Sequence, residues 1–451
     1  MPVMRLQQNC RHLWWSWAMS EWVNTNLGQA ANLVNKKPTL FKGTTQYLAT
    51  SDVVGFSAIP SETVSFPHRP SRADVFLSEG DVLQAKMKGT NKAYLVSNNM
   101  NGWLASTGFA QFKPSIVGNC SHYIYNYISG ECFLKERDRL SVGSTQQAIS
   151  DKDLRSISIS LPSSIREQKK IASILSSCNA SIKKTEELID KYQQIKAGLM
   201  HDLFTRGIAA DGKLRPPREQ APELYQETPI GWIPKDWNCE NIETIKDSLV
   251  DGPFGSNLKT EHYVIDPEVR VVRLQNIVAS KYNDSDKAYV SQKHANTLLR
   301  NKVIGGDVLI AGLGEERYPV GRACIYPSTL PPAINKADCF RLRCNQEKLS
   351  NKFLMGFLNT SMARDQIRKY EQGVTRPRIN LGNMNRIRVP VPSRNEQIKI
   401  VHKFDNLSLK IETEVEIKDK YNKRRLGLMH DLLTGKVPVT IVEHEAINES
   451  L

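Results

Sequence analysis

Apolar residues recur at helical spacing along two long stretches of the chain. In the first stretch they lie three, four or seven positions apart and comprise Ile171, Leu175, Cys178, Ile182, Ile189, Tyr192 and Leu199. In the second stretch they comprise Ile400, Phe404, Leu407, Ile411, Tyr421 and Leu428. This spacing places the apolar side chains on one face of an α-helix. We therefore predict two long amphipathic helical regions, over residues 163–206 and 393–436.

The two stretches are copies of one another. Gly198-Leu-Met-His-Asp-Leu203 recurs unchanged as Gly427-Leu-Met-His-Asp-Leu432, and Glu167 returns as Glu396, 229 positions later (396 − 167). No gap is needed between these landmarks. A period this long indicates a duplicated domain, because the repeats of a solenoid span only about 20 to 50 residues. Two equivalent halves imply pseudo-twofold symmetry.

Each predicted helix needs a partner for its apolar face. About 36 residues at roughly 1.5 Å each give a rod of about 50 Å, which is longer than most helices of globular proteins. Thr185 and Lys196 interrupt the first apolar face, and Lys418 and Arg425 interrupt the second. The repeat itself offers a matching face. We therefore predict that the two helices pair as an intramolecular antiparallel coiled coil.

The rest of the chain alternates short apolar runs with Gly, Asn and Ser. Runs such as Asp81–Ala85 and Ile157–Leu161 are typical of strands. The predicted fold class is α+β, with two mixed α/β domains separated by the two long antiparallel helices. The predicted segments are an N-terminal extension (1–18), a first domain (19–162), a first helical region (163–206), an extended linker with polyproline character (207–229), a second domain (230–392), a second helical region (393–436) and a C-terminal tail (437–451).

The beginning of the sequence allows two start codons. Residues 1–18 are expected to form a loose extension. A start at Met19 is the alternative, because Trp22 then occupies the place that Trp237 occupies in the second half.

Composition bounds the class of protein. At 451 residues the chain exceeds the roughly 250 to 300 residues at which a single core stops growing, so at least two domains are expected. The 61 Lys and Arg against 47 Asp and Glu leave a net charge of +14, which favours a polyanionic partner without saying which one. The eight scattered cysteines have no zinc spacing and indicate reduced thiols in the cytoplasm. No apolar run approaches the length of a membrane span.

Several sequence landmarks mark the second predicted domain and the starts of the two predicted helices. They comprise Pro229-Ile-Gly-Trp-Ile-Pro-Lys-Asp-Trp237, Gly252-Pro-Phe-Gly-Ser-Asn-Leu258, Val271-Val-Arg-Leu-Gln-Asn-Ile277 and the two helix starts at which a proline precedes Glu167-Gln168 or Glu396-Gln397. Together these landmarks resemble one known family, the specificity subunits of type I restriction-modification systems. The resemblance extends from Met19 to about Val437. Its most diagnostic feature is the order of two variable domains that alternate with two repeated helical regions.

The resemblance implies a function. Each domain would be a target-recognition domain for one half of a bipartite site in double-stranded DNA. The helices would set the length of the unspecified spacer and dock two modification (methyltransferase) subunits that carry S-adenosylmethionine. Restriction (motor-nuclease) subunits could join that complex. A separation of about 50 Å corresponds to roughly 15 base pairs.

The residues suited to DNA contact form clusters in both domains. Cationic and amide side chains are the groups that bind base edges and phosphates. The candidates are Lys86, Lys88, Thr90, Asn91, Lys92, Thr145, Gln146 and Gln147 in the first domain, and Arg270, Arg273, Gln275, Arg317, Tyr318, Arg322, Thr375, Arg376 and Arg378 in the second. Gly143-Ser-Thr-Gln-Gln147 and Gly373-Val-Thr-Arg-Pro-Arg378 occupy equivalent places. Gln in one copy and Arg in the other would change the base that is recognised, or else position phosphates.

The repeated motif at the end of each helix is interpreted as a docking surface for a partner protein. Its candidate residues are Leu199, Met200, His201 and Asp202 in the first copy, and Leu428, Met429, His430 and Asp431 in the second. The His-Asp pairs have no third ligand nearby in the sequence, so we expect no metal site there. We also find no methyltransferase tetrapeptide, no P-loop and no nucleophile constellation. The chain is therefore expected to hold no cofactor and to catalyse no reaction itself.

Two alternatives remain open at this point. The chain could be a coiled-coil scaffold whose basic surface binds nucleic acid without sequence preference, or an enzyme with an unrecognised catalytic site. The scaffold predicts equal affinity for random and genomic duplexes, whereas the enzyme predicts methylation or cleavage by the isolated chain.

Overall fold

The structure, a computed structural model, describes residues 21–144, 146–315 and 318–441, which fall into two compact units. Unit 1 extends to Leu188 and resumes at Glu414, and unit 2 comprises Ile189–Thr413. Both unit boundaries fall inside long helices, α5 (Ile165–Thr205) and α11 (Arg394–Leu433). The predicted extension 1–18 and the last part of the predicted tail, from residue 442, lie outside the described residues.

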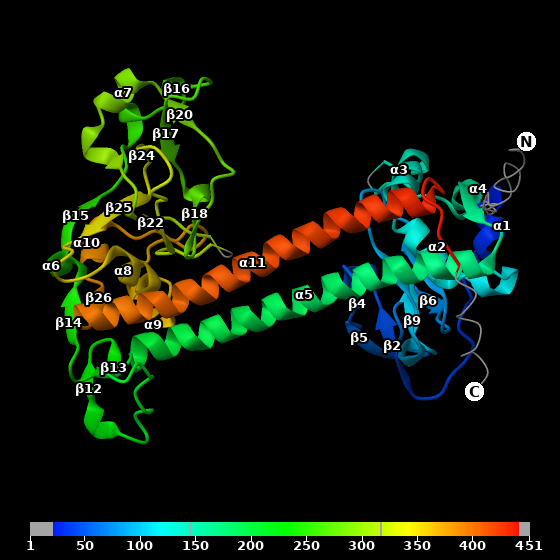
Figure 1. The fold of residues 1–451 in the computed structure, drawn as a ribbon, viewed down its shortest axis with the longest axis horizontal. Helices are drawn as coiled ribbons and strands as arrows, with labels where there is room; N and C mark the ends of the chain where they lie inside the picture. Colours follow the sequence, from blue (N-terminus) through cyan, green and yellow to red (C-terminus); the bar gives the residue numbers. More distant parts are fainter. Residues whose placement is uncertain (1–20, 145, 316–317, 442–451) are drawn as a thin grey trace, which may run out of the picture. The chain divides into compact units, whose positions relative to one another are not determined.

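The domain of unit 1 is built from four small sheets and short helices (Figure 1). Its strands are β1 (Trp22–Asn26), β2 (Thr44–Leu48), β3 (Val53–Val54), β4 (Ser57–Ala58), β5 (Glu62–Ser65), β6 (Ala73–Phe76), β7 (Val82–Ala85), β8 (Ala93–Leu95), β9 (Leu104–Ser106), β10 (Phe109–Phe112) and β11 (Ser158–Pro162). Its helices are α1 (Leu27–Ala31), α2 (Ser121–Ile128), α3 (Glu131–Leu140) and α4 (Asp151–Ser156), with 3-10 turns η1 (Thr50–Asp52), η2 (Asn98–Met100) and η3 (Pro114–Val117). The strands predicted at Asp81–Ala85 and Ile157–Leu161 are β7 and β11.

The domain of unit 2 has five sheets. Its strands are β12 (Tyr225–Thr228), β13 (Gly231–Pro234), β14 (Asn238–Asn241), β15 (Lys246–Val250), β16 (Tyr263–Val264), β17 (Val269–Val272), β18 (Ile277–Val278), β19 (Lys281–Tyr282), β20 (Tyr289–Val290), β21 (Lys302–Val303), β22 (Val308–Ala311), β23 (Ala323–Ile325), β24 (Ala333–Asn335), β25 (Cys339–Cys344) and β26 (Arg388–Val391). Its helices are α6 (Ile242–Ile245), α7 (Gln292–Asn296), α8 (Asn351–Leu358), α9 (Ser361–Tyr370) and α10 (Leu381–Asn385), with 3-10 turns η4 (Pro222–Leu224), η5 (Gly255–Asn257), η6 (Thr260–His262), η7 (Leu274–Asn276) and η8 (Leu299–Asn301).

The two domains share one topology. The sheet order β10-β7-β8 in unit 1 matches β25-β22-β23 in unit 2, and β5-β2-β9-β6 matches β20-β17-β24-β21. Each of the latter sheets contains one parallel pair, β2 with β9 and β17 with β24. The first strand also pairs with the strand before the long helix in both units, β1 with β11 and β14 with β26. The duplication predicted from the helices therefore extends to the two domains, whose fine sequences differ greatly.

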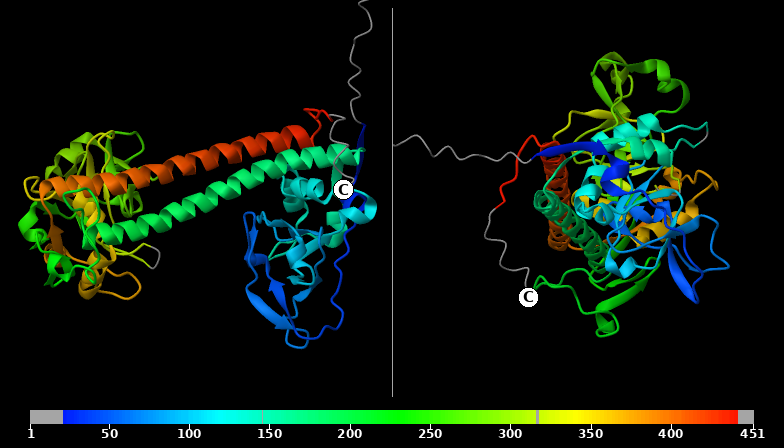
Figure 2. Two further views of the ribbon diagram at one scale, coloured as in Figure 1. Left: turned by 60° about the horizontal axis from the view of Figure 1, so that its bottom comes forward. Right: turned by 90° about the vertical axis from the view of Figure 1, so that its right-hand side faces the viewer.

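In unit 1, residues 165–188 of α5 and 414–433 of α11 lie side by side and run in opposite directions (Figures 1 and 2). The Arg425 Nε donates to Asn179 Oδ1 at 2.6 Å, and Lys418 lies 3.9 Å from Glu186 farther along the pair. Ile171, Leu175 and Ile182 of the predicted apolar face are buried, which confirms the face. Burial of such side chains supplies about 1.5 to 3 kcal/mol each.

In unit 2, residues 189–205 and 394–413 pair in the same antiparallel sense. Phe204 packs against Phe404 with ring centroids 6.5 Å apart, and both belong to the core of the domain. Lys196, which interrupts the apolar face, is partly buried beside Glu412 and Asp405, and burial lowers the pKa of its ammonium group. The antiparallel helix pairing predicted from the sequence is thus confirmed within each unit.

A buried glutamine fixes the start of each long helix. Gln168 accepts a hydrogen bond from the Cys120 amide at 2.9 Å and donates to the Pro162 carbonyl at 2.9 Å. Gln397 likewise accepts from the Ser350 amide at 2.9 Å and donates to the Pro392 carbonyl at 3.0 Å. Both side chains are only 1% exposed. The glutamine of the repeated motif is therefore explained by the structure, because it satisfies backbone groups of the domain that packs on the helix.

The segment 207–229, expected to be an extended linker, is folded instead. Arg215 forms an ion pair with buried Glu396 at 2.5 Å, and Glu396 also accepts from the Ile208 amide at 2.7 Å. At Gly207, where φ is +63°, an added Cβ would lie 2.3 Å from the Trp237 ring. The physical reason for the difference is this long-range network, which the polyproline-like local sequence does not reveal.

Among the described residues, none of the helices combines the length and the apolar character that a bilayer crossing requires. The seven cysteines within that part of the chain are all free thiols.

Candidate nucleic-acid interface

In the first domain, two loops that carry predicted DNA-contacting residues lie against each other. One connects β7 to β8, and the other follows α3. The Lys88 amide donates to the Gln147 carbonyl at 2.9 Å, and the Ile149 amide donates to the Lys86 carbonyl at 3.0 Å. The fold therefore brings together two clusters that the sequence placed far apart. The candidate side chains that are exposed there are Lys88, Asn91, Gln146 and Gln147.

The remaining candidates in this domain have internal partners. The Lys86 ammonium lies 2.9 Å from the Asp151 carboxylate, and the Lys92 ammonium donates to the Thr50 carbonyl at 2.7 Å. The Thr90 hydroxyl donates to the Met87 carbonyl at 2.7 Å and shapes the hairpin turn. Thr145 lies outside the described residues. These contacts hold the loops in place beneath the exposed amide and ammonium groups.

The second domain repeats this loop arrangement. The Gly314 amide donates to the Pro377 carbonyl at 2.9 Å, and the Ile379 amide donates to the Gly312 carbonyl at 2.9 Å. The loop that follows α9 starts at Gly373, where φ is +89°, a backbone conformation that glycine adopts without strain. Its first-domain counterpart also starts at a positive-φ glycine. The same backbone scaffold therefore presents different side chains.

Residue equivalence follows from the backbone register of the two loops. Val142 bridges to Ala148 in the first domain, and Gln372 bridges to Arg378 in the second, with the same number of residues between them. Each loop is numbered from the first residue of its bridging pair. By this count Gln146 in the first domain occupies the position that Arg376 occupies in the second. The structure thus supports the pairing of the two loops that the sequence suggested.

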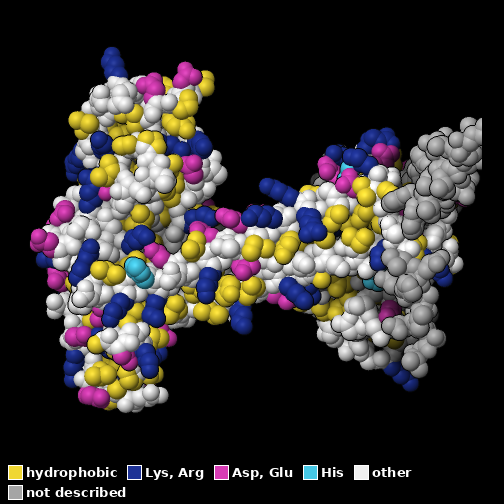
Figure 3. Space-filling view, viewed as in Figure 1, with side chains coloured by type: hydrophobic (Ala, Val, Ile, Leu, Met, Phe, Trp, Pro, Cys, Tyr) yellow, Lys and Arg dark blue, Asp and Glu magenta, His cyan; other side chains and the backbone are white. Residues whose placement is uncertain are grey.

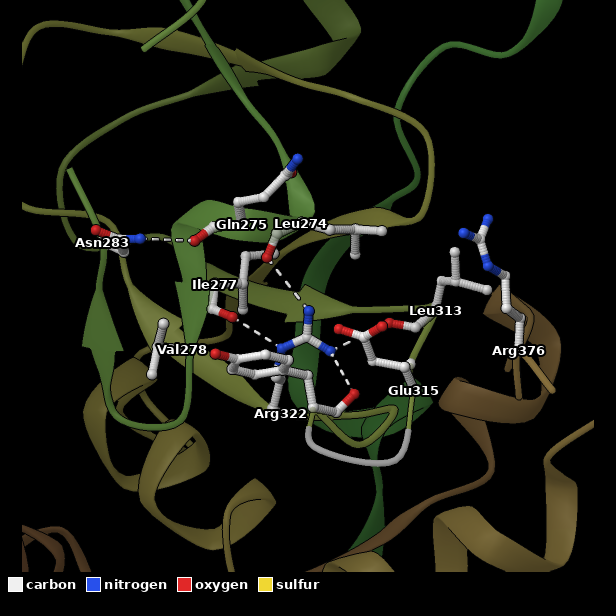
Figure 4. A pocket seen from close by; sticks show the side chains of 11 residues that line it. Leu274, Gln275, Ile277, Val278, Asn283, Leu313, Glu315, Arg322 and Arg376 are labelled. Carbon is white, nitrogen blue, oxygen red and sulfur yellow. Dashed lines mark hydrogen bonds between the residues drawn. The ribbon is translucent and has the colours of Figure 1, made fainter. Parts of the chain in front are cut away.

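Four candidates of the second domain surround one cavity of about 400 Å³ (Figure 4). Gln275 enters it from η7, Tyr318 and Arg322 from the segment between β22 and β23, and Arg376 from the loop after α9. The sequence did not indicate the other lining residues, among them Leu274, Asn283 and Glu315. Thr375 is exposed in the same loop, and Arg317 lies outside the described residues.

Arg322 forms the floor of this cavity and is only 8% exposed. Its guanidinium donates to the Ile277 carbonyl at 2.8 Å, to the Tyr318 carbonyl at 3.0 Å and to the Leu274 carbonyl at 3.2 Å. No carboxylate of the described residues lies within ion-pair distance, and burial lowers the pKa of this guanidinium. Arg322 therefore connects the walls of the cavity through these hydrogen bonds. Its positive charge contributes a positive electrostatic potential at the base of the cavity.

Arg270 and Arg273 lie away from the cavity. Arg270 is 6% exposed and forms an ion pair with Asp284 at 2.6 Å. Arg273 Nε donates to Asp286 at 2.8 Å. Both guanidinium groups are thus held by carboxylates of the segment between β19 and β20. They remain predicted DNA contacts, but in this structure they stabilise the domain.

Arg378 is half exposed and lies 2.9 Å from Asp338. Asp338 in turn donates its backbone amide to the Asp251 carboxylate at 2.9 Å. Burial, together with the nearby charge of Asp338, raises the pKa of Asp251 to about 6, although two backbone hydrogen bonds and the charge of Arg378 act to lower it. This acidic cluster anchors the loop after α9 to the turn after β15.

The repeated motif at the helix ends has a buried and an exposed side. Leu203 of the first copy belongs to the core of unit 2, and Leu432 of the second copy to that of unit 1. The docking candidates Leu199, Met200, Leu428 and Met429 pack against these same cores, whereas His201 and His430 are exposed and Asp202 and Asp431 are partly exposed. Packing against the cores explains why the buried residues of the motif are apolar. It does not explain why the exposed His and partly exposed Asp residues are identical in the two copies.

A metal site is not evident where the sequence offered His-Asp pairs. Among the described residues, no three His, Cys, Asp or Glu side chains are grouped so that they could hold an ion.

On the face drawn in Figure 3, Lys and Arg side chains are interspersed with acidic and apolar ones rather than gathered in one patch. The net charge of +14 therefore does not by itself locate an interface on that face.

Comparison with known proteins gives concordant matches. The family described as "Type I restriction modification DNA specificity domain" matches residues 19–194 and 256–422. The MjaVIII type I restriction enzyme specificity subunit of Methanocaldococcus jannaschii is 23% identical over 369 residues, which cover 81% of this chain and 81% of that protein.

Two solved structures share the fold. One, from work on complex assembly and conformational transition of the type I R-M system, has a TM-score of 0.55 at 16% identity and covers 92% of this chain and 98% of its own. The other, the type I restriction-modification system S subunit from M. genitalium, has a TM-score of 0.54 at 15% identity and covers 97% of this chain and 99% of its own.

Proposed function

This chain belongs to the type I restriction-modification DNA specificity family, and we propose that it is the DNA-recognition subunit of a type I restriction-modification complex. Each domain recognises one half of a bipartite site in double-stranded DNA. The observation that carries this proposal is the duplicated loop scaffold, which holds different polar side chains at equivalent positions. A shared backbone that holds different side chains is suited to binding two different base sequences in the same manner.

The two helical regions set the distance between the half-sites and dock the partner subunits. The antiparallel pairing within each unit supports this role, because paired helices are stiffer than a flexible linker. A spacer of defined length follows from such a connection. The folded segment 207–229 also supports it, since the ion pair of Arg215 with Glu396 ties the start of the second domain to α11.

The repeated helix ends are the docking sites for two modification subunits. Gly198 and Gly427 lie inside helices and have nothing within 4 Å of an added Cβ, so the fold does not require them. A glycine inside a helix costs about 0.5 to 1 kcal/mol relative to alanine. Each lies three residues before an exposed histidine, His201 or His430, on the same helix face. Identical exposed groups in both copies fit one kind of partner that binds twice.

The proposed reaction belongs to those partners. They carry S-adenosylmethionine and methylate adenine in each half-site, and restriction subunits join the same complex to cleave unmodified DNA. The chain itself supplies recognition and geometry in the cytoplasm, where the host DNA is exposed to the complex. DNA binding is consistent with the net charge, since neutralised phosphates release counterions.

The test is equilibrium binding by the complex purified through a tag on this chain. Duplexes selected from a randomised pool are compared with shuffled duplexes of equal length and composition at two salt concentrations. We expect the selected duplexes to bind at least about a thousandfold more tightly. Equal affinity for both sets would favour the coiled-coil scaffold with non-specific nucleic-acid binding. Methylation by this chain in the absence of partners would favour an enzyme.

A further inference from the structure

A cationic side chain occupies the same place in both domains, partly buried in the first and buried in the second. Ala93 pairs with Gln84 across β7 and β8, and Ala323 pairs with Ile310 across β22 and β23. The residue before each alanine is Lys92 in the first domain and Arg322 in the second. The two sites are therefore topologically equivalent, although their side chains differ.

Each of these two cations binds the equivalent turn of its own domain. Lys92 donates to the carbonyl of Thr50, the first residue of η1, at 2.7 Å. Arg322 donates to the carbonyl of Leu274, the first residue of η7, at 3.2 Å. Both turns directly follow equivalent strands, β2 and β17, and precede equivalent two-stranded hairpins.

The turns also share their internal hydrogen bond. The Ala49 amide donates to the Asp52 side chain at 2.8 Å, and the Arg273 amide donates to the Asn276 side chain at 2.8 Å. This contact fixes the conformation of each turn. The middle residue, Ser51 in the first domain and Gln275 in the second, is exposed. Equivalent scaffolds thus present one exposed residue from each turn.

The loop after α9 presents the second exposed residue of this scaffold. Arg376 lines the same cavity as Gln275 (Figure 4), and neither side chain has a hydrogen bond or ion pair with any described residue. Gln146, the equivalent of Arg376, is likewise exposed and free within that part of the chain. By contrast, Arg378 of the same loop is held by Asp338.

We propose that positions 146 and 376 are the specificity-determining positions of the two domains, and that Ser51 and Gln275 contact the neighbouring base. This inference rests on the proposed DNA-recognition function. A guanidinium donates two parallel hydrogen bonds to O6 and N7 of guanine, whereas an amide pairs with N6 and N7 of adenine. Arg376 therefore recognises guanine and Gln146 recognises adenine. Lys92 and Arg322 are positioning residues that hold the turns beneath them.

The experiment is selection from randomised duplexes by the tagged complex that contains Arg376→Gln, which installs the residue of the first domain. We expect the guanine of one half-site to be replaced by adenine, with a preference that changes on the order of tenfold to a hundredfold. The other half-site keeps its sequence. The reciprocal variant Gln146→Arg should change adenine to guanine in that other half-site. Arg368→Gln removes the same charge from an exposed position of α9 and should change neither.

The outcomes separate the two proposals. If the wild-type complex selects no sequence, the recognition function and this assignment both fail. If the wild type selects a bipartite site and Arg376→Gln keeps its guanine, only the assignment fails. A uniform loss of affinity across all sequences, with a salt dependence reduced by about one unit, would assign Arg376 to a phosphate and overturn the assignment.

Discussion

Arg425 of α11 donates a hydrogen bond to Asn179 of α5 at 2.6 Å, inside the helix pair of unit 1. Its guanidinium also lies 5.5 Å from the ring of Phe56, which belongs to the loop between β3 and β4. Burial lowers the pKa of this guanidinium. A residue that interrupts the apolar face of α11 therefore links both helices to the first recognition domain, and its polarity is satisfied there.

Replacement of Arg425 by alanine should destabilise unit 1. The Asn179 side chain, which is 9% exposed, would lose its partner, and a buried unsatisfied group costs about 1 to 3 kcal/mol. Urea unfolding followed by circular dichroism measures the change. The matched control is Arg424→Ala, which removes the same charge from an exposed neighbouring position. Equal stability of the two variants would contradict the proposed role of the Arg425 contact.

The buried glutamine at the start of α11 should be required for stability of unit 2. Gln397→Ala would leave the Ser350 amide and the Pro392 carbonyl without partners, at a cost of roughly 2 to 4 kcal/mol. Differential scanning calorimetry would show a lowered Tm. Gln193→Ala, at an exposed position of α5, should change the Tm little. A Tm for Gln397→Ala within the error of wild type would refute this explanation of the repeated motif.

Because of Asp251, the free energy of unfolding should fall as the pH rises from about 4 to about 6. Its folded-state pKa of about 6 lies above the ordinary value of 3.8, so between these values the folded state binds more protons than the unfolded state. The charged form is thus unfavourable at pH 7, and Asp251→Asn should stabilise the protein by roughly 1 to 3 kcal/mol there. The difference between variant and wild type should shrink at pH 4.5. A difference that is constant with pH would exclude this carboxyl as the titrating group.

Loss of an exposed histidine should remove one partner subunit. His201→Ala or His430→Ala alone should give complexes with one modification subunit in place of two, and the double variant should retain none. Mass photometry of the tagged complex measures the stoichiometry. His402→Ala, at another exposed position of α11, is the control and should retain both subunits. Full occupancy in the double variant would show that docking occurs elsewhere.

Lengthening both helices should lengthen the spacer. Seven residues inserted after Glu187, and seven before Lys418, keep the apolar faces nearly in phase and add about 10 Å of helix. We expect the spacer of the recognised site to grow by roughly three base pairs, with both half-sites unchanged. Sequencing of bound duplexes gives the spacer directly. An unchanged spacer would mean that the helices do not set it.

The sequence predicted the helices well because their signal is local and repeated. The regions 163–206 and 393–436 contain helices over Ile165–Thr205 and Arg394–Leu433. Apolar periodicity, a proline before each start and a glycine just beyond each end are all visible without a structure. By contrast, the packing of the segment 207–229 depends on Glu396, which lies almost two hundred positions away.

The candidate site was predicted in part. The two positive-φ glycines, Gly143 and Gly373, mark the equivalent loops in the sequence, and the structure supports their equivalence. The burial of Arg270 and Arg322 was not visible, because it arises from carboxylates of the segment between β19 and β20 and from carbonyls of several turns and strands that only the fold brings together. The turn residues Ser51 and Gln275 became equivalent only through sheet topology, since no local motif connects them.

DNA recognition by this chain in the cell would be measured by a map of N6-methyladenine across the host genome, with and without this gene. We expect one bipartite motif, with two short specified halves and a spacer of fixed length, methylated only when the gene is present. Identical methylation maps in the two strains would contradict the proposed recognition function.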